Sequence, residues 1–275
     1  MLQGPVVASF GYHEVTDNPG ASGFQRSSAE PYKLTRLAFA HHLDQVAGGG
    51  LVPELVLDIE PARPGRHLLL TFDDGGKSAL YISEALCRRG WRGHFFIVTG
   101  LIGSRTFLDA AEIRYVRSCG HVLGTHSHTH PGPFREQPFG QMFEEWRVSR
   151  DRLCQLLGEP CTTGSVPGGD ISRLAFASAA SAGLRYLFTS EPTLCPERVN
   201  DCWVLGRFIP KATTSPARVG QLARFRGWRR ALLARRMKLL LRGMAPGAYR
   251  TYVRLRAGAP IQGDGSPAAP GRSEV

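Results

Sequence analysis

The chain has 275 residues, a hydrophobic share of 42% and a formal net charge of +11 at pH 7. This length suits one large domain, because α/β barrels of this size fold as single units. No stretch reaches the roughly 18 consecutive apolar residues that a membrane-spanning helix needs, and we expect no secretory signal at the start. The six cysteines lack Cys-x-x-Cys pairs, which favours reduced thiols in a cytoplasmic protein over a disulfide or zinc framework.

Apolar runs alternate along the chain with segments of helical periodicity. The predicted strands are residues 5–12, 67–72, 94–98 and 121–125, with weaker ones at 162–166, 185–190 and 203–209. The predicted helices are residues 76–90, 109–119 with Asp109 as the cap, 139–157 ending at Gly158, and 171–182. This alternation is typical of a mainly parallel sheet, and seven strands favour closure into a barrel.

Polar side chains follow three of the predicted strands. Functional residues of parallel α/β folds gather at the carboxyl ends of strands, so we expect these side chains to meet. An irregular loop, residues 14–33, is expected to lie over the same strand ends. The polar residues are Asp73 and Asp74 after LLLTF, His126, His128 and His130 after HVLGT, and His13 after PVVASFGY.

Carboxylates and imidazoles in this arrangement indicate a site for a divalent transition metal. Such an ion needs about three protein ligands and an open position to activate water. His126 and His130 are four residues apart, which brings both imidazoles to one side of a helical turn, and Asp74 would complete the set. Asp73 would then accept the proton of the attacking water. His128 is expected to point away. A solvated turn and an adventitious metal patch are the alternatives for the two motifs.

The motifs TFDDG and HSHTHP, about fifty residues apart, resemble the first two motifs of the NodB-homology polysaccharide deacetylases, the carbohydrate esterase family 4 type. FGYHEV near the start and SVPGGD at 165–170 are also similar to elements of this superfamily, and the resemblance covers about residues 5–210. It implies a distorted (β/α)7 barrel and removal of an N-acetyl group from a sugar. It also implies Asp73 as the general base and a metal, typically zinc, with Co²⁺, Ni²⁺ or Mn²⁺ as other candidates. The implied ligands are Asp74, His126 and His130.

Two positions depart from the family pattern. Many relatives carry an Arg two residues before the Pro of the third motif, where this chain has Ser165, and many end with a Leu-x-His motif that is absent here. The poly-N-acetylglucosamine deacetylase branch is more similar, because its acid is a histidine on the first strand in a YH context. That similarity implies His13 as the general acid, with a structural histidine as the alternative. A backbone N–H in the Gly168-Gly169 turn after Pro167 is expected to help hold the oxyanion.

The positive charge is concentrated near the C-terminus. Residues 203–256 contain fourteen Lys or Arg and no Asp or Glu, which leaves −3 of the total +11 for the rest of the chain. Anionic lipid or nucleic acid is the physical candidate for such a segment, and nucleic acid is disfavoured because no reading motif is present. We predict a barrel domain at 1–212, a basic helical extension at 213–256 and a disordered tail at 257–275.

The stretch RFRGWRRALLARRMKLLLRG within this extension predicts a helix with an apolar and a basic side. The pattern is that of a helix at an anionic membrane surface, and a helix packed on the barrel with a solvated basic face is the alternative. Leu233, Met237, Leu240, Leu241 and Met244 share one side, with Arg235, Lys238 and Arg242 roughly opposite.

The sequence therefore predicts a metal-dependent carbohydrate N-deacetylase that acts in the synthesis of a surface polysaccharide or glycolipid. Its expected partners are an N-acetylated sugar polymer or a lipid-linked saccharide, and the expected location is cytoplasmic, peripheral on the inner face of the membrane. Another amide hydrolase on the same scaffold is the first alternative. The second is a degenerate deacetylase fold that binds saccharide or membrane without turnover, which Ser165 and the absent last histidine motivate.

Overall fold

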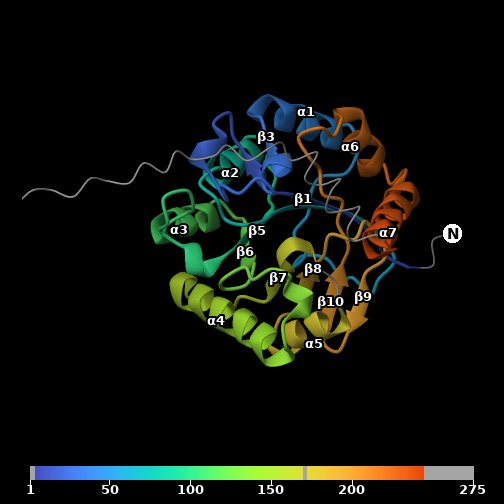
Figure 1. Ribbon diagram of the computed structural model, residues 1–275. Coiled ribbons are helices and arrows are strands. Elements are labelled where there is room, and N and C mark those ends of the chain that lie inside the picture. Colours follow the sequence, from blue (N-terminus) through green and yellow to red (C-terminus); the bar gives the residue numbers. More distant parts are fainter. Residues whose placement is uncertain (1–3, 170–171, 245–275) are drawn as a thin grey trace, which may run out of the picture. The chain divides into compact units, whose positions relative to one another are not determined.

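The computed structural model describes residues 4–169 and 172–244, with side chains described as far as residue 237. Its centre is an eight-stranded sheet in the order β1-β4-β5-β6-β7-β8-β10-β9 (Figure 1). All neighbours pair in parallel except β9, which is antiparallel to β10. The strands are β1 Val6–Tyr12, β4 Arg66–Phe72, β5 His94–Ile97, β6 Val122–Thr125, β7 Thr163–Ser165, β8 Tyr186–Phe188, β9 Glu197–Val199 and β10 Cys202–Leu205.

The two ends of this sheet approach each other just beyond β10. The Gly11 N–H donates to the Phe208 carbonyl at 2.9 Å, and the Phe208 N–H donates to the Ser9 carbonyl at 2.9 Å. A side chain at Gly11 would place its Cβ 2.5 Å from Ile209 Cδ1, so Ile209 would have to shift to admit one. The predicted distorted barrel of parallel strands is confirmed, with β9 as an added antiparallel edge.

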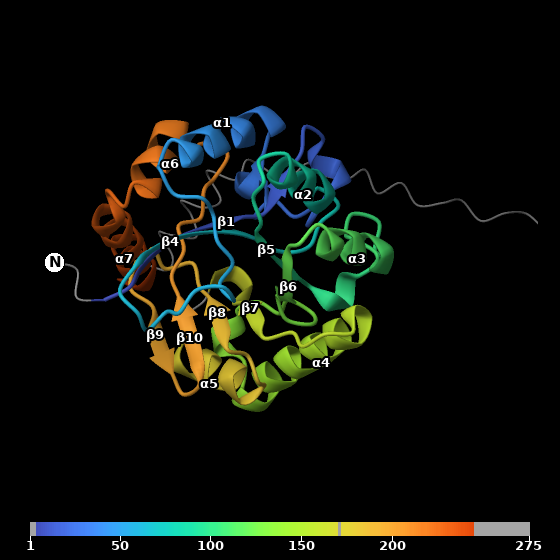
Figure 2. The ribbon, with the colours of Figure 1, turned by 180° about the vertical axis from the view of Figure 1, so that it is seen from behind.

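Helices cover the outside of the sheet in the two opposite views (Figure 1, Figure 2). All four predicted helices are confirmed: Asp109 forms a capping box with Glu112, and Gly158 ends its helix in the left-handed conformation. The first helix was not predicted, and it packs on the sixth, which lies within the predicted helical extension at 213–256. The six are α1 Arg36–Ala47, α2 Ala79–Cys87, α3 Ala110–Ser118, α4 Phe139–Leu157, α5 Arg173–Ser181 and α6 Pro216–Ala223.

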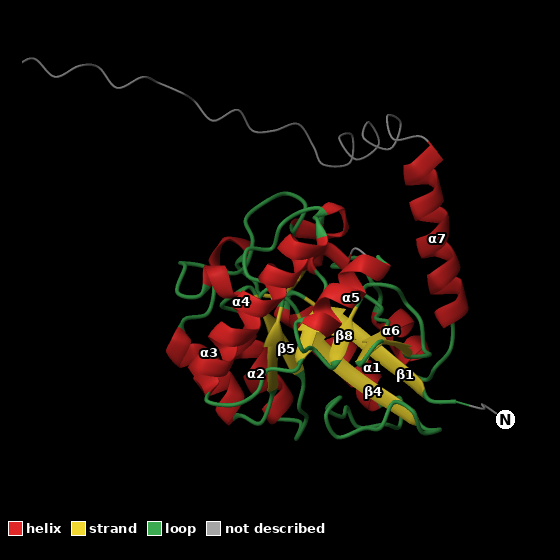
Figure 3. Ribbon diagram, turned by 90° about the horizontal axis from the view of Figure 1, so that it is seen from below, coloured by secondary structure: helices red, strands yellow, loops and turns green. Residues whose placement is uncertain are grey.

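Buried aromatic side chains fill the space between the sheet and the helices. Phe72 on β4 stacks on Phe95 of the neighbouring strand at 4.8 Å, and Tyr12 on β1 stacks on Phe72 at 5.9 Å. Figure 3 shows β1 and β4 side by side, as their seven-residue register requires. This packing holds the parallel strands in place, so the polar residues that follow them lie at the same edge of the sheet.

The loop after β1 has structure of its own. β2 (Glu14–Val15) pairs with β3 (Lys33–Leu34), and two short 3₁₀ turns, Pro19–Ala21 and Glu30–Tyr32, lie between them. The predicted irregular loop at 14–33 is therefore partly ordered by this small two-stranded sheet.

The chain divides into a compact unit, Met1–Arg236, and a second unit, Met237–Val275. A seventh helix, α7 (Trp228–Met244), begins in the first unit, where Trp228 is buried against Phe10 with ring centroids 6.1 Å apart. The predicted boundaries at 212 and 256 stay predictions, and the predicted tail at 257–275 lies outside the described residues. Within the described part of the chain, none of the helices combines the length and the apolar character needed to span a membrane.

Candidate active site

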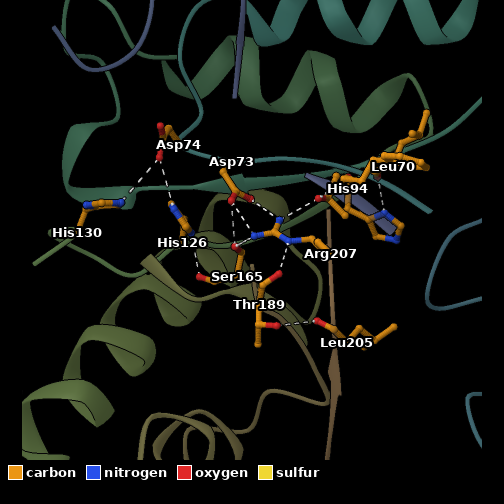
Figure 4. Close-up of polar contacts among 12 residues, drawn as sticks. Leu70, Asp73, Asp74, His94, His126, His130, Ser165, Thr189, Leu205 and Arg207 are labelled. Carbon is orange, nitrogen blue, oxygen red and sulfur yellow. Dashed lines mark hydrogen bonds and ion pairs between the residues drawn. The ribbon is translucent and has the colours of Figure 1, made fainter. Parts of the chain in front are cut away.

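The two adjacent aspartates sit in a tight turn where β4 ends. The Asp73 N–H donates to the Tyr12 carbonyl at 2.9 Å, and the Asp74 carbonyl accepts from the Val98 N–H at 3.2 Å. Asp74 has a left-handed backbone with φ 72°, an uncommon conformation that clusters at functional sites. This turn sends the two carboxylates to different partners: Asp74 faces two histidines, and Asp73 faces an arginine (Figure 4).

Three side chains converge as a donor set for a metal ion. Asp74 Oδ1 lies 3.4 Å from Nε2 of His126 and 3.9 Å from Nε2 of His130. One ligand atom from each of the three lies within 4.8 Å of the others, and no other such group occurs in the described residues. Asp74 Oδ1 is buried without a hydrogen-bond partner, which a cation at this point would supply. The donor set fits a divalent transition metal.

The loop after β6 orients both imidazoles. His126 Nδ1 lies 2.9 Å from the Ser165 carbonyl. Since a carbonyl only accepts, Nδ1 carries the proton and Nε2 keeps its lone pair for a metal. Ser127 and His130 are both left-handed, and the His130 N–H donates to Ser127 Oγ at 3.0 Å. His128 points away, as expected, with Nδ1 3.0 Å from Thr99 Oγ1.

Burial works against charge in this donor set. Burial, and then the charges of Asp73 and Glu14, raise the pKa of Asp74 well above its ordinary value. Burial also lowers the pKa of His126, and burial with the charge of His126 lowers that of His130 to about 3. These shifts all favour the uncharged forms of the three side chains. A bound divalent ion would favour ionised Asp74 and unprotonated rings.

Asp73 is bound by an arginine that the sequence analysis did not single out. Arg207 follows β10, and its Nη1 and Nη2 donate to the two oxygens of Asp73 at 2.8 Å and 2.9 Å. Burial disfavours the ionised carboxyl, but the charges and hydrogen bonds around it, those of Arg207 first, hold the pKa of Asp73 below its ordinary value. Asp73 is thus a fixed, ionised carboxylate.

The Arg207 guanidinium is fully buried, and all five of its N–H donors have partners. Besides Asp73, it donates to the Thr189 carbonyl at 3.0 Å and to Thr71 Oγ1 at 2.8 Å. It also donates to Ser165 Oγ at 2.8 Å, and that hydroxyl lies 3.2 Å from Asp73 Oδ2. Many relatives carry Arg at the position of Ser165. Here Ser165 is instead part of a hydrogen-bond network in which Arg207, just after β10, supplies the guanidinium.

A signal for Arg207 was present in the sequence. It stands in the run WVLGRFI, where an arginine surrounded by apolar residues needs a buried partner. Counting it among the fourteen basic residues of the C-terminal segment obscured that signal, because most of the others lie on the surface or beyond the described side chains.

His13 lies half-buried at the end of β1, beside Tyr32 with ring centroids 4.9 Å apart. Its Nδ1 has no hydrogen-bond partner, which disfavours a purely structural role. Burial lowers the pKa of His13 to about 4, while the charge of Asp73 opposes that shift. The ring is thus neutral at pH 7 and lies within electrostatic reach of the candidate base.

The predicted oxyanion turn follows Ser165 directly. Pro167, Gly168 and Gly169 form a 3₁₀ turn, with Gly168 at φ 65°. The Gly169 N–H already donates to the Val166 carbonyl at 3.0 Å, and Pro167 has no N–H. Of the three residues in this turn, only Gly168 therefore has a backbone N–H that could still donate a hydrogen bond to the oxyanion.

The loop between β2 and β3 covers the metal donors. Phe24 packs against His130 with ring centroids 5.0 Å apart, and Arg26 Nη2 lies 3.5 Å from His130 Nδ1. Glu14 is buried and accepts from the hydroxyls of Ser22 and Ser78, which ties the loop to the start of α2. The loop between β2 and β3 therefore covers the metal donors and is held to α2 by the hydrogen bonds of Glu14.

The geometry defines a barrel with a carboxylate-histidine donor set beside an arginine-bound aspartate, and sequence comparison gives the same class. Residues 60–187 match the family model described as polysaccharide deacetylase. Residues 60–187 therefore form a polysaccharide deacetylase domain, as the motifs within them indicated. Comparison with curated proteins gives no match.

Solved structures share the fold at low sequence identity. The chain is similar to the Streptococcus pyogenes deacetylase PplD in complex with acetate, with 18% identity, a TM-score of 0.67, and coverage of 80% of this chain and 99% of that one. It is also similar to IcaB from Ammonifex degensii, with 21% identity, a TM-score of 0.65, and coverage of 81% and 98%. A Bacillus cereus polysaccharide deacetylase, BC0361, matches at 16% identity and a TM-score of 0.67, with coverage of 80% and 69%.

Proposed function

We propose that the protein is a metal-dependent N-deacetylase that hydrolyses an N-acetyl group on a sugar polymer or a lipid-linked saccharide, nearest in kind to deacetylation of poly-N-acetylglucosamine. The observation that carries this is the division of labour between the adjacent carboxylates: Asp74 belongs to a metal donor set, and Asp73 is held ionised by Arg207. Amide hydrolysis needs an activated water, a stabilised oxyanion and an acid for the amine.

Asp74, His126 and His130 would hold the metal, Zn²⁺ or a similar ion such as Co²⁺, Ni²⁺ or Mn²⁺. When bound, the ion would act as a Lewis acid that polarises the amide carbonyl and makes the attacking water acidic. The chain's own part is to orient the donors: the Ser165 carbonyl fixes the tautomer of His126, and the left-handed turn at Asp74 aims its carboxylate.

Asp73 would accept the proton of the attacking water. The Arg207 fork keeps this carboxylate ionised at neutral pH and fixes its orientation, so no reorganisation is needed when the proton arrives. His13, which is neutral in the resting site, would take up the proton that Asp73 receives from the water and pass it to the leaving amine. The Gly168 N–H would donate to the oxyanion. Pro167 and Gly169 would shape that turn.

Turnover is favoured over a degenerate binding protein because the arginine absent from the third motif has a counterpart in Arg207. An amidase for another substrate on the same scaffold is the remaining alternative. Acetate release from N-acetylglucosamine oligomers and from lipid-linked N-acetyl sugars, measured with the zinc-loaded protein and with Asp73→Asn, tests the proposal. Release that is lost in the variant supports it. No release from any N-acetyl sugar, together with turnover of a non-sugar amide, would replace it with the amidase.

We further propose that the protein works at the cytoplasmic face of a membrane, bound through its basic C-terminal segment to anionic lipid. Among the described side chains of α7, Arg229, Arg230 and Arg236 are exposed, and Leu233 is 62% exposed. Arg235, placed opposite the apolar side in the sequence analysis, instead pairs with Glu191 at 2.7 Å. Leu233 therefore does not pack on the barrel, although the start of the helix does, through the buried Trp228. An exposed leucine among arginines is typical of helices at lipid surfaces.

Co-sedimentation with vesicles that contain anionic lipid tests this membrane proposal. Leu233→Glu should weaken vesicle binding severalfold, because it places a charge where an apolar side chain would enter the lipid interface. Leu37→Glu is the matched control, since Leu37 on α1 is 66% exposed. Equal binding of both variants and the unmodified chain would contradict the proposal.

A further inference from the structure

An arginine of the loop between β2 and β3 lies beside the metal donors. Arg26 is exposed, and its Cζ lies 4.3 Å from the ring centroid of Phe24. The Phe24 ring is itself held by His130 and by the buried Phe107, at centroid distances of 5.0 Å and 5.2 Å. A cation over an aromatic face is attracted by the ring, so this contact keeps a positive charge next to His130.

A lysine has the same arrangement beside the candidate acid. Lys211, in the segment after β10, is half-buried, and its Nζ lies 5.4 Å from the ring centroid of Tyr32. The Tyr32 ring packs against His13 with centroids 4.9 Å apart, and Tyr32 belongs to the same loop as Phe24. Each of the two cations therefore lies over an aromatic ring that contacts a histidine of the site.

The protein does not neutralise either cation. Among the side chains that the structure describes up to residue 237, no carboxylate oxygen lies within 4.0 Å of Arg26 or Lys211. Burial is the first cause that lowers the pKa values of His13 and His130, and the positive charge of Arg26 adds to it in both. Two unpaired cations at the rim of one site attract an anionic ligand.

Phosphate matches this pair of side chains in shape and charge. A guanidinium donates two parallel hydrogen bonds to phosphate oxygens, and an ammonium adds a compact point charge. A phosphate ester carries about two negative charges near neutral pH, one for each cation, whereas a carboxylate carries one. The aromatic contacts hold both side chains in place before a ligand arrives, which reduces the entropy lost on binding.

We propose that Arg26 and Lys211 bind a phosphate group of the substrate, so that the enzyme selects N-acetyl sugars esterified to phosphate or diphosphate over neutral ones. This proposal rests on the proposed deacetylase function and narrows its substrate class. A saccharide that is joined to lipid through phosphate belongs to the selected class, and an uncharged sugar polymer does not. The two side chains bind and orient the substrate and take no part in proton transfer.

The test measures kcat/KM for acetate release from N-acetylglucosamine, its 1-phosphate and a lipid diphosphate of the same sugar. With the zinc-loaded protein we expect about a tenfold or larger preference for both phosphate esters over the neutral sugar. The preference should fall as the ionic strength rises. Arg26→Gln combined with Lys211→Gln should remove the preference, and each single substitution should reduce it by a smaller factor. Arg26→Lys and Lys211→Arg should keep most of it.

Arg66→Gln is the matched control. Arg66 is exposed and also lies over an aromatic ring, with its Cζ 4.2 Å from the centroid of Phe225. It begins β4, whereas Asp73 follows the other end of that strand, so the preference for phosphate should be unchanged in this variant. All variants are compared at equal zinc content, because Arg26 lies beside a metal donor.

Equal cleavage of neutral and phosphate-bearing sugars overturns the phosphate site, as does a preference that survives in the double variant; the deacetylase itself stands in both cases. A preference for the lipid diphosphate without one for the 1-phosphate would show recognition of lipid, and it overturns the site as well. Should no sugar release acetate, the deacetylase function fails, and calorimetry with N-acetylglucosamine 1-phosphate decides the phosphate site separately. Binding that is lost in the double variant and kept in Arg66→Gln supports the site, and unchanged or absent binding overturns it.

Discussion

Asp73 and Asp74 are neighbours in the chain and are almost equally buried, at 4% and 5% exposure, yet their pKa values move in opposite directions. Asp74 faces two neutral imidazoles and other carboxylates, so burial and like charge raise its pKa. Asp73 faces a guanidinium that donates to both of its oxygens, and its pKa falls. The metal side and the arginine side of the site therefore differ in partner and not in residue type or depth.

This contrast explains how adjacent carboxylates can share one site. Two ionised acids next to each other repel, and one of them is usually pushed to high pKa. Here Arg207 favours the ionised form of Asp73, whereas nothing in the chain offsets the raised pKa of Asp74. A divalent cation bound beside Asp74 would favour its ionised form. Four predictions probe the contrast, beginning with the largest expected effect.

Removal of either histidine of the metal side should abolish metal binding. His126→Ala and His130→Ala each delete one of three donors, so we expect less than a tenth of the zinc content of the unmodified protein and at least a ~10³-fold loss of acetate release. Atomic absorption on protein purified without chelator measures the first effect. His128→Ala is the control and should keep its metal, since His128 faces Thr99. Metal loss in all three variants alike would contradict the assignment.

Removal of Arg207 should destabilise the fold, because Asp73 would remain buried without its counter-charge. Breaking one side of a buried ion pair costs about 3–5 kcal/mol, so Arg207→Met should lower the free energy of unfolding by that amount in urea. In the Asp73→Asn background the same substitution should cost clearly less, since no carboxylate is left unpaired. Equal costs in both backgrounds would show that the two side chains are not coupled.

His94 is a buried titratable group whose hydrogen bonds are to the backbone and not to a carboxylate, so it tests the effect of burial alone on a pKa. It lies fully buried on β5, its Nε2 accepts from the Val56 N–H at 2.8 Å, and burial lowers its pKa to about 4. Because the folded pKa is depressed from 6.5, the neutral ring contributes stability above pH 6.5 that is lost as the pH falls toward 4. Between pH 7 and pH 5, urea unfolding should show a loss about 2 kcal/mol larger than in His94→Gln. Parallel losses would contradict this neutral state.

The smallest effect is expected at Ser165. Its hydroxyl joins Arg207 and Asp73 but carries no charge, so Ser165→Ala should cost about 1 kcal/mol of stability. Acetate release should fall only a few-fold, because both direct hydrogen bonds between Arg207 and Asp73 remain. A loss as large as that of Arg207→Met would mean that the serine, and not the arginine, positions the base.

The sequence identified the metal side far better than the arginine side. Asp73, Asp74, His126 and His130 occur in two contiguous motifs at strand ends, so their proximity followed from the parallel order of the sheet. Arg207 is 134 residues from Asp73, and only the closure of β1 against the segment after β10 brings them together. A contact that depends on how a sheet curls cannot be read from local spacing.

The helices show a similar limit. Those with clear caps, at Asp109 and Gly158, were predicted, whereas α1 was missed although Thr35 caps it. For α7 the periodicity of the sequence distinguished an apolar and a basic side of the helix. It did not indicate which of the two sides faces the barrel. The ion pair of Arg235 with Glu191 turns the helix so that Leu233 faces outward.

The most direct test of the central claim compares two isosteric variants, Asp73→Asn and Asp74→Asn, for bound zinc and for acetate release. The account predicts that Asp73→Asn keeps about one equivalent of metal and loses turnover, while Asp74→Asn loses both. Metal that depends on Asp73, or that survives without Asp74, would contradict the separate roles of the two carboxylates.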